Sequence, residues 1–180
     1  WLSLGLNEAY GGLSGTALDS AVLMEGLGRA LVVEPYLASV VMGGAVIELA
    51  GTAAQKSAHL PALGTGNLLL AFAFAEPRSR YDLASTATTA KKGSDGYILN
   101  GHKSVVFHAA TADKIIISAR TAGKENESNG ISLFLLERTA PGLTLQAYPT
   151  IDGGRAAEVK LVAAAGELLG EAGKAHAVIE

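Results

Sequence analysis

The spacing of apolar residues changes near Gly66, and this change restricts the fold more than any other feature of the sequence. Before Gly66, apolar side chains such as Leu18, Ala21 and Val22 recur at three- and four-residue intervals, which is typical of one face of a helix. After it, apolar runs of strand length alternate with Gly, Asn, Asp and Pro clusters. We therefore expect an α+β chain, in which an N-terminal helical subdomain precedes an antiparallel β-barrel or sandwich domain.

Local signals place three helices in the first part of the chain. Thr16 and Asp19 have the spacing of a capping box, with Asp in place of the usual Glu, so a helix should begin after Thr16. Pro35 suits the first turn of a second helix. Thr52 can cap a third helix that ends near the Gly64-Thr65-Gly66 turn, although Pro61 is unfavourable inside it and can break it.

The second part of the chain has the pattern of a series of short strands. The continuous apolar run "NLLLAFAFA" at 67–75 predicts a strand that is buried on both faces. Asn100-Gly101 lies between two alternating runs and is the strongest short-range signal for a two-residue hairpin turn. We divide the chain into a partial helical domain at 1–66, a β-domain at 67–165, and the start of a linker or C-terminal helical domain at 166–180.

Composition excludes several classes of function. The formal net charge is −3 and the basic residues form no patch with aromatic ones, so we expect no nucleic-acid partner. The chain has no cysteine, which excludes disulfides and thiolate chemistry, and its histidines lack the spacing of a metal site. The longest mostly apolar stretch, at 36–50, is too short to span a bilayer. We expect a cytoplasmic protein with no bound metal and no membrane insertion.

The end of the continuous apolar run carries a concentration of polar groups in a chain of which only 17% is charged. These groups are Glu76, Arg78, Ser79, Arg80 and Asp82. One interpretation is a plain turn, in which Asp82 caps the backbone or pairs with an arginine. The other is a ligand site, because guanidinium groups and turn amides can hold a diphosphate. The residues alone leave both interpretations open.

Four segments resemble, in the same order, motifs of the acyl-CoA dehydrogenase family. They are "LGLNEAYGGLSGT", "GTAAQKSAHLPALGTG", "AFAFAEPRSRYDLASTATTA" and "DGYILNGHKSVVFHAATADKIIISART". With the later "GISLFLLERTAPG" and "GELLGEAGKA", the resemblance extends over nearly the whole chain, from the later part of the family's N-terminal helical domain through its middle β-domain. The "RSRYD" and "KSVV" pieces further resemble the small subunits of bacterial pimeloyl-CoA dehydrogenases.

The resemblance implies that this chain is a fragment from which the family's C-terminal four-helix bundle is absent. In the family, FAD lies between the β-domain and that bundle. An acyl-CoA is oxidised there to the trans-2-enoyl-CoA by α-proton abstraction and β-hydride transfer to the flavin. The glutamate that acts as the base belongs to the bundle, so none of Glu76, Asp82 and Glu158 is assigned that role. The isolated chain is expected to be inactive.

The resemblance also implies which residues contact the cofactor. By their positions in the motifs, the expected flavin-binding residues are Phe72, Phe74, Ala75, Arg80, Tyr81, Val105, Val106 and Phe107. Arg80 and Tyr81 are also expected to contact the acyl-CoA. At three of these positions a contact of the family's pattern is missing: Ala75 lacks a threonine hydroxyl, Val105 lacks an indole, and Phe107 cannot give a side-chain hydrogen bond to flavin N5. Tyr81, Arg78 and Arg80 also depart from it, since Tyr81 replaces a serine and the arginines replace small residues.

These departures leave more than one function open. The partners implied for a dehydrogenase are an acyl-CoA, an electron-transfer flavoprotein or similar acceptor, and other subunits in a homo- or hetero-oligomer (a dimer or a tetramer). A second interpretation is a non-catalytic subunit that pairs with an active one, which the missing threonine and tryptophan favour slightly. A third is a flavin monooxygenase of the same fold. The intact Glu76-Pro77 pair and the pattern around Asn100-Gly101 favour the first.

Overall fold

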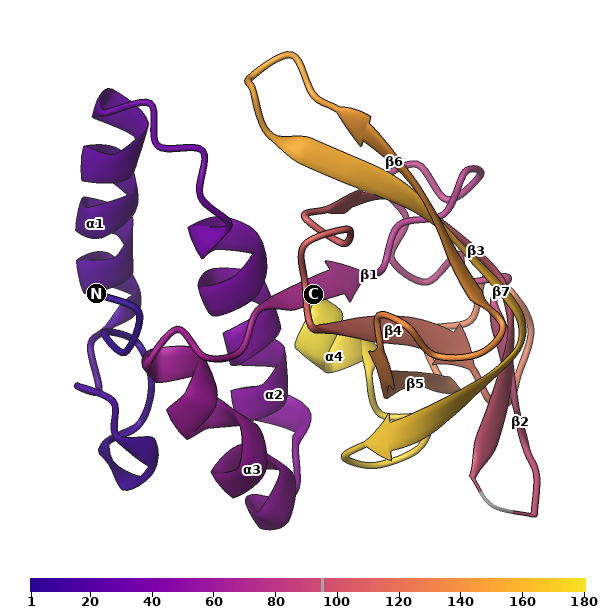
Figure 1. Cartoon of the computed structure of the whole chain (residues 1–180). Coiled ribbons are helices and arrows are strands. Elements are labelled where there is room, and N and C mark those ends of the chain that lie inside the picture. The colour runs from indigo at the N-terminus through magenta and orange to yellow at the C-terminus, as the bar shows by residue number, and fades with distance from the viewer. Residues whose placement is uncertain (95) are drawn as a thin grey trace.

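The computed structural model describes residues 1–94 and 96–180 and confirms the expected order of a helical part followed by a sheet. In Figure 1 the helices of the first part stand on one side of the molecule and the curved sheet on the other, with β1 (Leu70–Ala73) leading from the first part into the second. Within the described residues, no helix is both long and apolar enough to cross a membrane.

The helical part contains the three helices expected from the sequence, the second of which begins with π-helical turns. The elements are η1 (Glu8–Tyr10), α1 (Ala17–Arg29), η2 (Tyr36–Gly44), α2 (Ala45–Ala50) and α3 (Ala53–Gly64), with a short α4 (His176–Ile179) near the end of the chain. Thr16 forms the expected capping box with Asp19. Thr52, expected as a helix cap, also forms a complete capping box, with Gln55.

Helix α3 ends at Gly64, as expected, and Pro61 does not break it. A proline inside a helix costs about 3 kcal/mol through its missing N–H and its clash with the preceding turn. Leu60 and Leu63 lie on either side of it and are fully buried in the core between the helices and the sheet. This packing offsets the local cost, so tertiary contacts decide where α3 ends.

The described residues of the β-domain form a single sheet of seven strands. They are β1 (Leu70–Ala73), β2 (Thr89–Lys92), β3 (Tyr97–Phe107), β4 (Lys114–Arg120), β5 (Ile131–Glu137), β6 (Leu143–Pro149) and β7 (Arg155–Leu169). Most neighbours are antiparallel, but β4 pairs in parallel with β1 and, at one residue pair, with β2. The pairings run from β4 through β2, β3, β7 and β5 and return to β4, so the sheet curves into a closed circuit. Strand β7 continues past residue 165 to Leu169.

The hairpin turn expected at Asn100-Gly101 is wrong, because both residues lie inside β3. The turn between β2 and β3 instead contains Gly93 and Gly96, and the Gly93 N–H donates to the Gly96 carbonyl over 2.8 Å. At Asn100 the register of β3 against β7 slips, which is the mark of a β-bulge. The Asn100 side chain accepts a hydrogen bond there from the Ala163 N–H over 2.9 Å.

Gly101 is required by a close approach rather than by a turn. A Cβ atom at this position would lie 2.3 Å from the Thr88 hydroxyl oxygen, well inside contact distance. The Asn-Gly pair therefore has a role that its sequence signal does not reveal, since glycine serves both turns and tight strand contacts.

Two apolar cores share β1, which explains its continuous apolar sequence. Ala71 and Ala73 point into the core enclosed by the sheet. Leu70 and Phe72 point the other way, into the core between the sheet and the helices. The expectation of a strand buried on both faces is confirmed.

Candidate functional site

The structure brings the end of β1 beside the second half of β3, two segments that carry six of the residues expected to contact flavin. The Ser104 N–H donates to the Ala75 carbonyl over 3.0 Å. The Lys103 ammonium donates to the Phe74 carbonyl over 3.3 Å. These contacts join 72–76 to 103–107 across about thirty residues of sequence, and we call the two segments together the strand wall.

The side chains of the strand wall divide into buried and exposed sets. Phe72 and Val106 are buried in the two cores, and the rings of Phe72 and Phe74 pack with centroids 5.2 Å apart. Val105 is 50% exposed and Phe107 is 44% exposed. The strand wall therefore presents an apolar surface outside the cores, next to the backbone hydrogen bond between Ser104 and Ala75.

A β-bulge shapes this surface. The register against β7 slips between Lys103 and Val106, and Val105 has a φ angle of +52°, which is strained for a β-branched residue. Glu158 on β7 holds the outer side of the bulge. Its carboxylate lies 2.7 Å from His102 Nε2, accepts from the Tyr148 hydroxyl over 3.2 Å, and faces the Val105 N–H at 3.4 Å. Strain of this kind persists only where the surroundings over-determine it.

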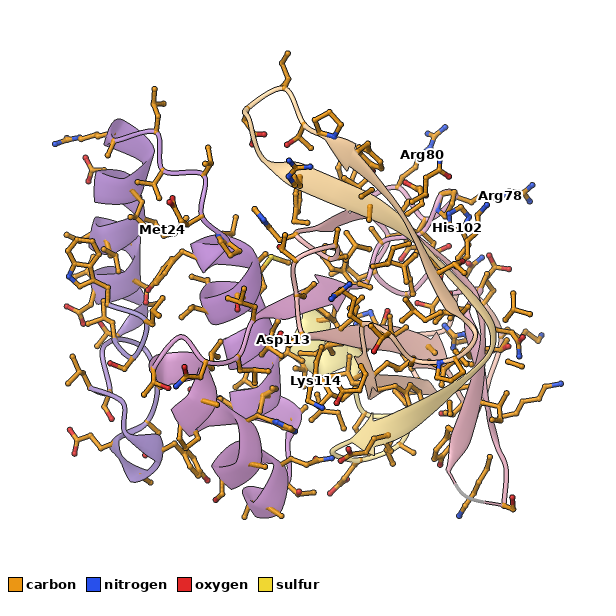
Figure 2. All side chains as sticks on the ribbon, in the orientation of Figure 1. Met24, Arg78, Arg80, His102, Asp113 and Lys114 are labelled. Atoms are coloured by element: carbon orange, nitrogen blue, oxygen red, sulfur yellow. The ribbon has the colours of Figure 1, made fainter. Side chains whose placement is uncertain are left out.

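The strand exit that carries Arg80 and Tyr81 lies in a turn with both side chains in solvent. Arg80 has a φ angle of +49°, and Tyr81 is fully exposed. Figure 2 shows the side chains of Arg78 and Arg80 projecting away from the sheet. Asp82 caps the backbone by accepting from the Ala84 N–H over 2.9 Å. Within the described chain, no ion pair joins either arginine to a carboxylate.

Sequence reasoning missed a buried ion pair directly behind the strand wall. Lys103 has no exposed surface, and its ammonium donates to Glu76 Oε1 over 2.6 Å and to the Ser118 hydroxyl over 3.0 Å. The only signals for it were the place of Glu76 at a strand exit and the inward phase of Lys103 along an alternating strand.

Burial and charge act against each other in this pair. Burial lowers the pKa of Lys103 to about 8, with the Glu76 carboxylate opposing the shift. Burial by itself raises the pKa of Glu76, but the Lys103 charge and the hydrogen bonds from Lys103 and the Thr88 backbone outweigh it and leave that pKa below its ordinary value. Both groups are therefore charged at neutral pH, and the Glu76 carboxylate is engaged in the ion pair with Lys103.

Sequence reasoning also missed Arg120, a nearly buried guanidinium surrounded by backbone carbonyls. It donates to the carbonyl oxygens of Ala84, Thr86, Ala122, Glu125, Glu127 and Asn129. These acceptors belong to two loops, one on each side of β4 in sequence. Arg120 therefore fixes the far end of the loop whose near end carries Arg80 and Tyr81. Burial lowers its pKa, but an arginine stays charged at any ordinary pH.

A cavity of about 370 Å³ opens between the helices and the β-domain beside Phe107. Its helical side is formed by the end of α1 and the segment 31–38, with side chains such as Leu27 and Val32. Its β side adds His108 and Asp152 to Phe107. Burial lowers the pKa of His108, with Asp152 opposing the shift, so the imidazole is neutral at pH 7. The cavity is mainly apolar, with one polar edge.

Comparisons with known proteins agree with this architecture along almost the whole chain. Residues 1–67 match the family model described as the acyl-CoA dehydrogenase N-terminal domain, and residues 71–163 match the acyl-CoA dehydrogenase middle domain. The chain belongs to the acyl-CoA dehydrogenase family.

Individual relatives place the chain within longer proteins. It is 33% identical over 140 residues to the probable acyl-CoA dehydrogenase YngJ of Bacillus subtilis. The aligned region covers 77% of this chain and 37% of that protein. The ChsE4-ChsE5 complex from Mycobacterium tuberculosis superposes with a TM-score of 0.89 at 27% identity, over 99% of this chain and 47% of that one. The FAD complex of PigA gives a TM-score of 0.88 at 28% identity, over 97% and 48%. The chain thus spans less than half the length of each of these proteins.

Proposed function

We propose that this chain forms one side of the active site of a flavin-dependent acyl-CoA dehydrogenase. The observation that carries the proposal is the exposed apolar pair Val105 and Phe107, held beside the end of β1, with Phe107 bordering a mainly apolar cavity. Membership of the family supports it, as does the likeness to PigA, whose structure is an FAD complex.

The residues present fit a flavin. A flat ring system needs an apolar platform with polar groups at its edge, and Val105 and Phe107 supply the platform. A diphosphate needs cations without competing carboxylates, and Arg80 meets this requirement. Bound FAD would supply the hydride acceptor for an acyl-CoA. Because Ala75, Val105 and Phe107 carry no polar side-chain atoms, this chain would bind the ring through backbone groups and apolar contact.

The same arrangement offers places for an acyl-CoA. The cavity beside Phe107 is lined mainly by apolar side chains, which suits an acyl chain and excludes water from its surroundings. Tyr81 has a hydroxyl and a flat face, both in solvent, and together with Arg80 it can contact the CoA.

No catalytic base is assigned within this chain. Glu76 is buried against Lys103, Asp82 caps Ala84, and Glu158 is engaged by His102 and Tyr148. We propose that the base belongs to a part of the protein outside residues 1–180. The chain by itself should then form no enoyl-CoA, because the proposed base would be missing from it. Detectable turnover by residues 1–180 alone would contradict this.

The proposal extends to domains and partners. Residues 1–66 would form part of an N-terminal helical domain, 67–165 the β-domain, and 166–180 the start of a linker or helical domain. The electrons would pass to an electron-transfer flavoprotein or a similar acceptor. The protein would work as a homo- or hetero-oligomer, an arrangement for which the ChsE4-ChsE5 complex is a precedent among its structural relatives.

Affinity for FAD tests the assigned residues in the protein that contains this chain, purified with any partner subunit. Arg80→Ala should weaken FAD binding by about tenfold, the value of one charge-assisted phosphate contact. Tyr81→Phe should raise the Michaelis constant for acyl-CoA. Lys91→Ala removes another exposed cation from β2 and serves as the matched control. Unchanged affinities in both test variants would show that the turn is purely structural.

A non-catalytic partner subunit is the second candidate, favoured by the apolar character of Ala75, Val105 and Phe107. The visible absorption of bound flavin in the purified protein separates the two, since a scaffold subunit would be colourless. Formation of enoyl-CoA with an artificial electron acceptor separates a dehydrogenase from a flavin monooxygenase of the same fold.

A further inference from the structure

The buried ion pair between Glu76 and Lys103 occupies the point where the two segments of the strand wall meet. Lys103 points inward to Glu76 and to the Phe74 carbonyl, while the N–H of the next residue, Ser104, donates to the Ala75 carbonyl. Two consecutive residues of β3 thus donate hydrogen bonds to two consecutive carbonyls just after β1. A shift of either segment would break both contacts.

The Glu76 carboxylate also closes the loop that carries Arg80 and Tyr81. Its two oxygens accept from the Ala87 N–H over 2.8 Å and from the Thr88 N–H over 3.0 Å. The loop leaves Glu76 and returns to it, so one side chain fixes both ends of the turn. The pair therefore links the β1 exit, this loop, β3 and, through Ser118, β4.

Stability alone is a weak reason to keep such a pair. Replacing a buried ion pair by apolar side chains of similar size is often neutral or stabilising, because removing two charges from water costs several kcal/mol per ion. The Lys103 ammonium nevertheless has three acceptors for its three protons, and the Glu76 carboxylate accepts three hydrogen bonds. A fully satisfied network of this kind specifies a geometry more than it adds stability.

We propose that Glu76 and Lys103 are positioning residues, which set the spacing between Ala75 and the Val105 bulge so that the strand wall fits a flavin. The flavin part of this statement rests on the proposed function. The positioning part concerns only this chain. Val105 lies two residues beyond Lys103 in a strained conformation, with Glu158 holding its outer side. Lys103 holds the inner side, and without it the strained bulge can relax.

The test compares three variants of residues 1–180: Glu76→Gln, Lys103→Met, and the two combined. Each single change leaves one buried charge unpaired and should destabilise the fold, whereas the double variant is neutral and should recover most of the lost stability. The decisive readout is the hydrogen-exchange rate of the Ser104 and Val105 N–H groups, measured by NMR. In the double variant these amides should exchange at least about tenfold faster relative to the core amides of β5.

The matched control is the pair formed by Lys114 on β4 and Glu137 on β5, which lies at the surface. Its double variant, Lys114→Met with Glu137→Gln, should leave exchange at Ser104 and Val105 unchanged. Unchanged exchange at those amides in the Glu76→Gln/Lys103→Met variant as well would overturn the proposal and leave the buried pair with a role in stability only.

FAD titration of the intact protein separates this inference from the proposed function. If both are right, the double variant recovers stability but loses about tenfold in FAD affinity, as expected for a platform held out of place. If the native protein does not bind FAD, the proposed function fails, while the exchange result still decides the positioning role.

Discussion

Helix α1 and strand β5 are both rich in apolar residues, yet the structure treats them in opposite ways. Of the seven residues of β5, all but Glu137 are buried, whereas none of the thirteen residues of α1 is. Strand β5 is hydrogen-bonded to β4 along one edge and to β7 along the other. One of its faces lies in the core enclosed by the sheet, and the other packs against the helices. Helix α1 stands at the outer edge of the helical part (Figure 1). It touches the rest of the molecule through partly buried side chains such as Leu23 and Leu27. The number of packed neighbours, more than composition, decides how strongly an element is held.

The largest expected effect comes from the β5 core. Phe134→Ala would remove a fully buried ring whose centroid lies 5.1 Å from that of the Tyr97 ring. It should lower the free energy of unfolding by about 3–5 kcal/mol. Leu18→Ala in α1 removes an exposed side chain and should change it by less than about 0.5 kcal/mol. Urea denaturation measures both. Similar losses in the two variants would contradict the contrast between α1 and β5.

Arg120 extends the comparison to polar groups. Arg120→Met keeps much of the apolar stem but leaves six carbonyl oxygens without the guanidinium donor. The free energy of unfolding should therefore fall by about 2–4 kcal/mol. Arg29→Met in α1, where the arginine forms an exposed pair with Glu25, is the control and should have almost no effect. A loss at Arg120 no greater than at Arg29 would show that solvent readily replaces the guanidinium in these two loops.

The two capping boxes sharpen the contrast between a packed helix and an exposed one. Thr52→Ala at the start of α3 should cost about 1 kcal/mol of global stability, because Leu60 and Leu63 couple this helix to the core. Thr16→Ala removes the same motif from α1, and its effect should appear as local fraying of that helix. Hydrogen exchange resolves the two cases. Equal global losses would mean that α1 unfolds only together with the rest of the molecule.

The smallest effect is a change in the slope of stability against pH. The pKa of Glu76 is lower in the folded chain than in the unfolded chain, so the unfolded state binds more protons as the pH falls. The stability due to Glu76 is present above the unfolded pKa and is lost as the pH falls through the acid range. The double variant Glu76→Gln/Lys103→Met should therefore show a shallower loss of stability in acid.

Asp19 provides the control for this measurement. Hydrogen bonds from the Thr16 side chain and backbone lower its pKa as well, but it lies at the exposed start of α1. Asp19→Asn should alter the slope less, because solvent screens an exposed carboxylate. A slope that responds only to Asp19 would place the acid sensitivity in the helix instead of the ion pair.

Local chemistry predicted a good part of this protein. The capping residues Thr16 and Thr52, the order of helices before strands, and the double burial of β1 all depend on neighbours in sequence, and all were predicted correctly. The ordered motifs predicted the family. The assigned flavin and acyl-CoA contacts remain predictions that the binding experiments test.

The tertiary structure alone decided the features that join distant segments. Gly101 is needed because Thr88, just before β2, approaches it closely, and α3 passed through Pro61 because the core holds its flanking leucines. Glu76 and Lys103 are 27 positions apart, and their pairing requires β1 and β3 to lie side by side. A sequence determines propensity and period within a few residues, but the burial of a charge or the need for a glycine depends on which surfaces meet, and only the folded chain fixes that.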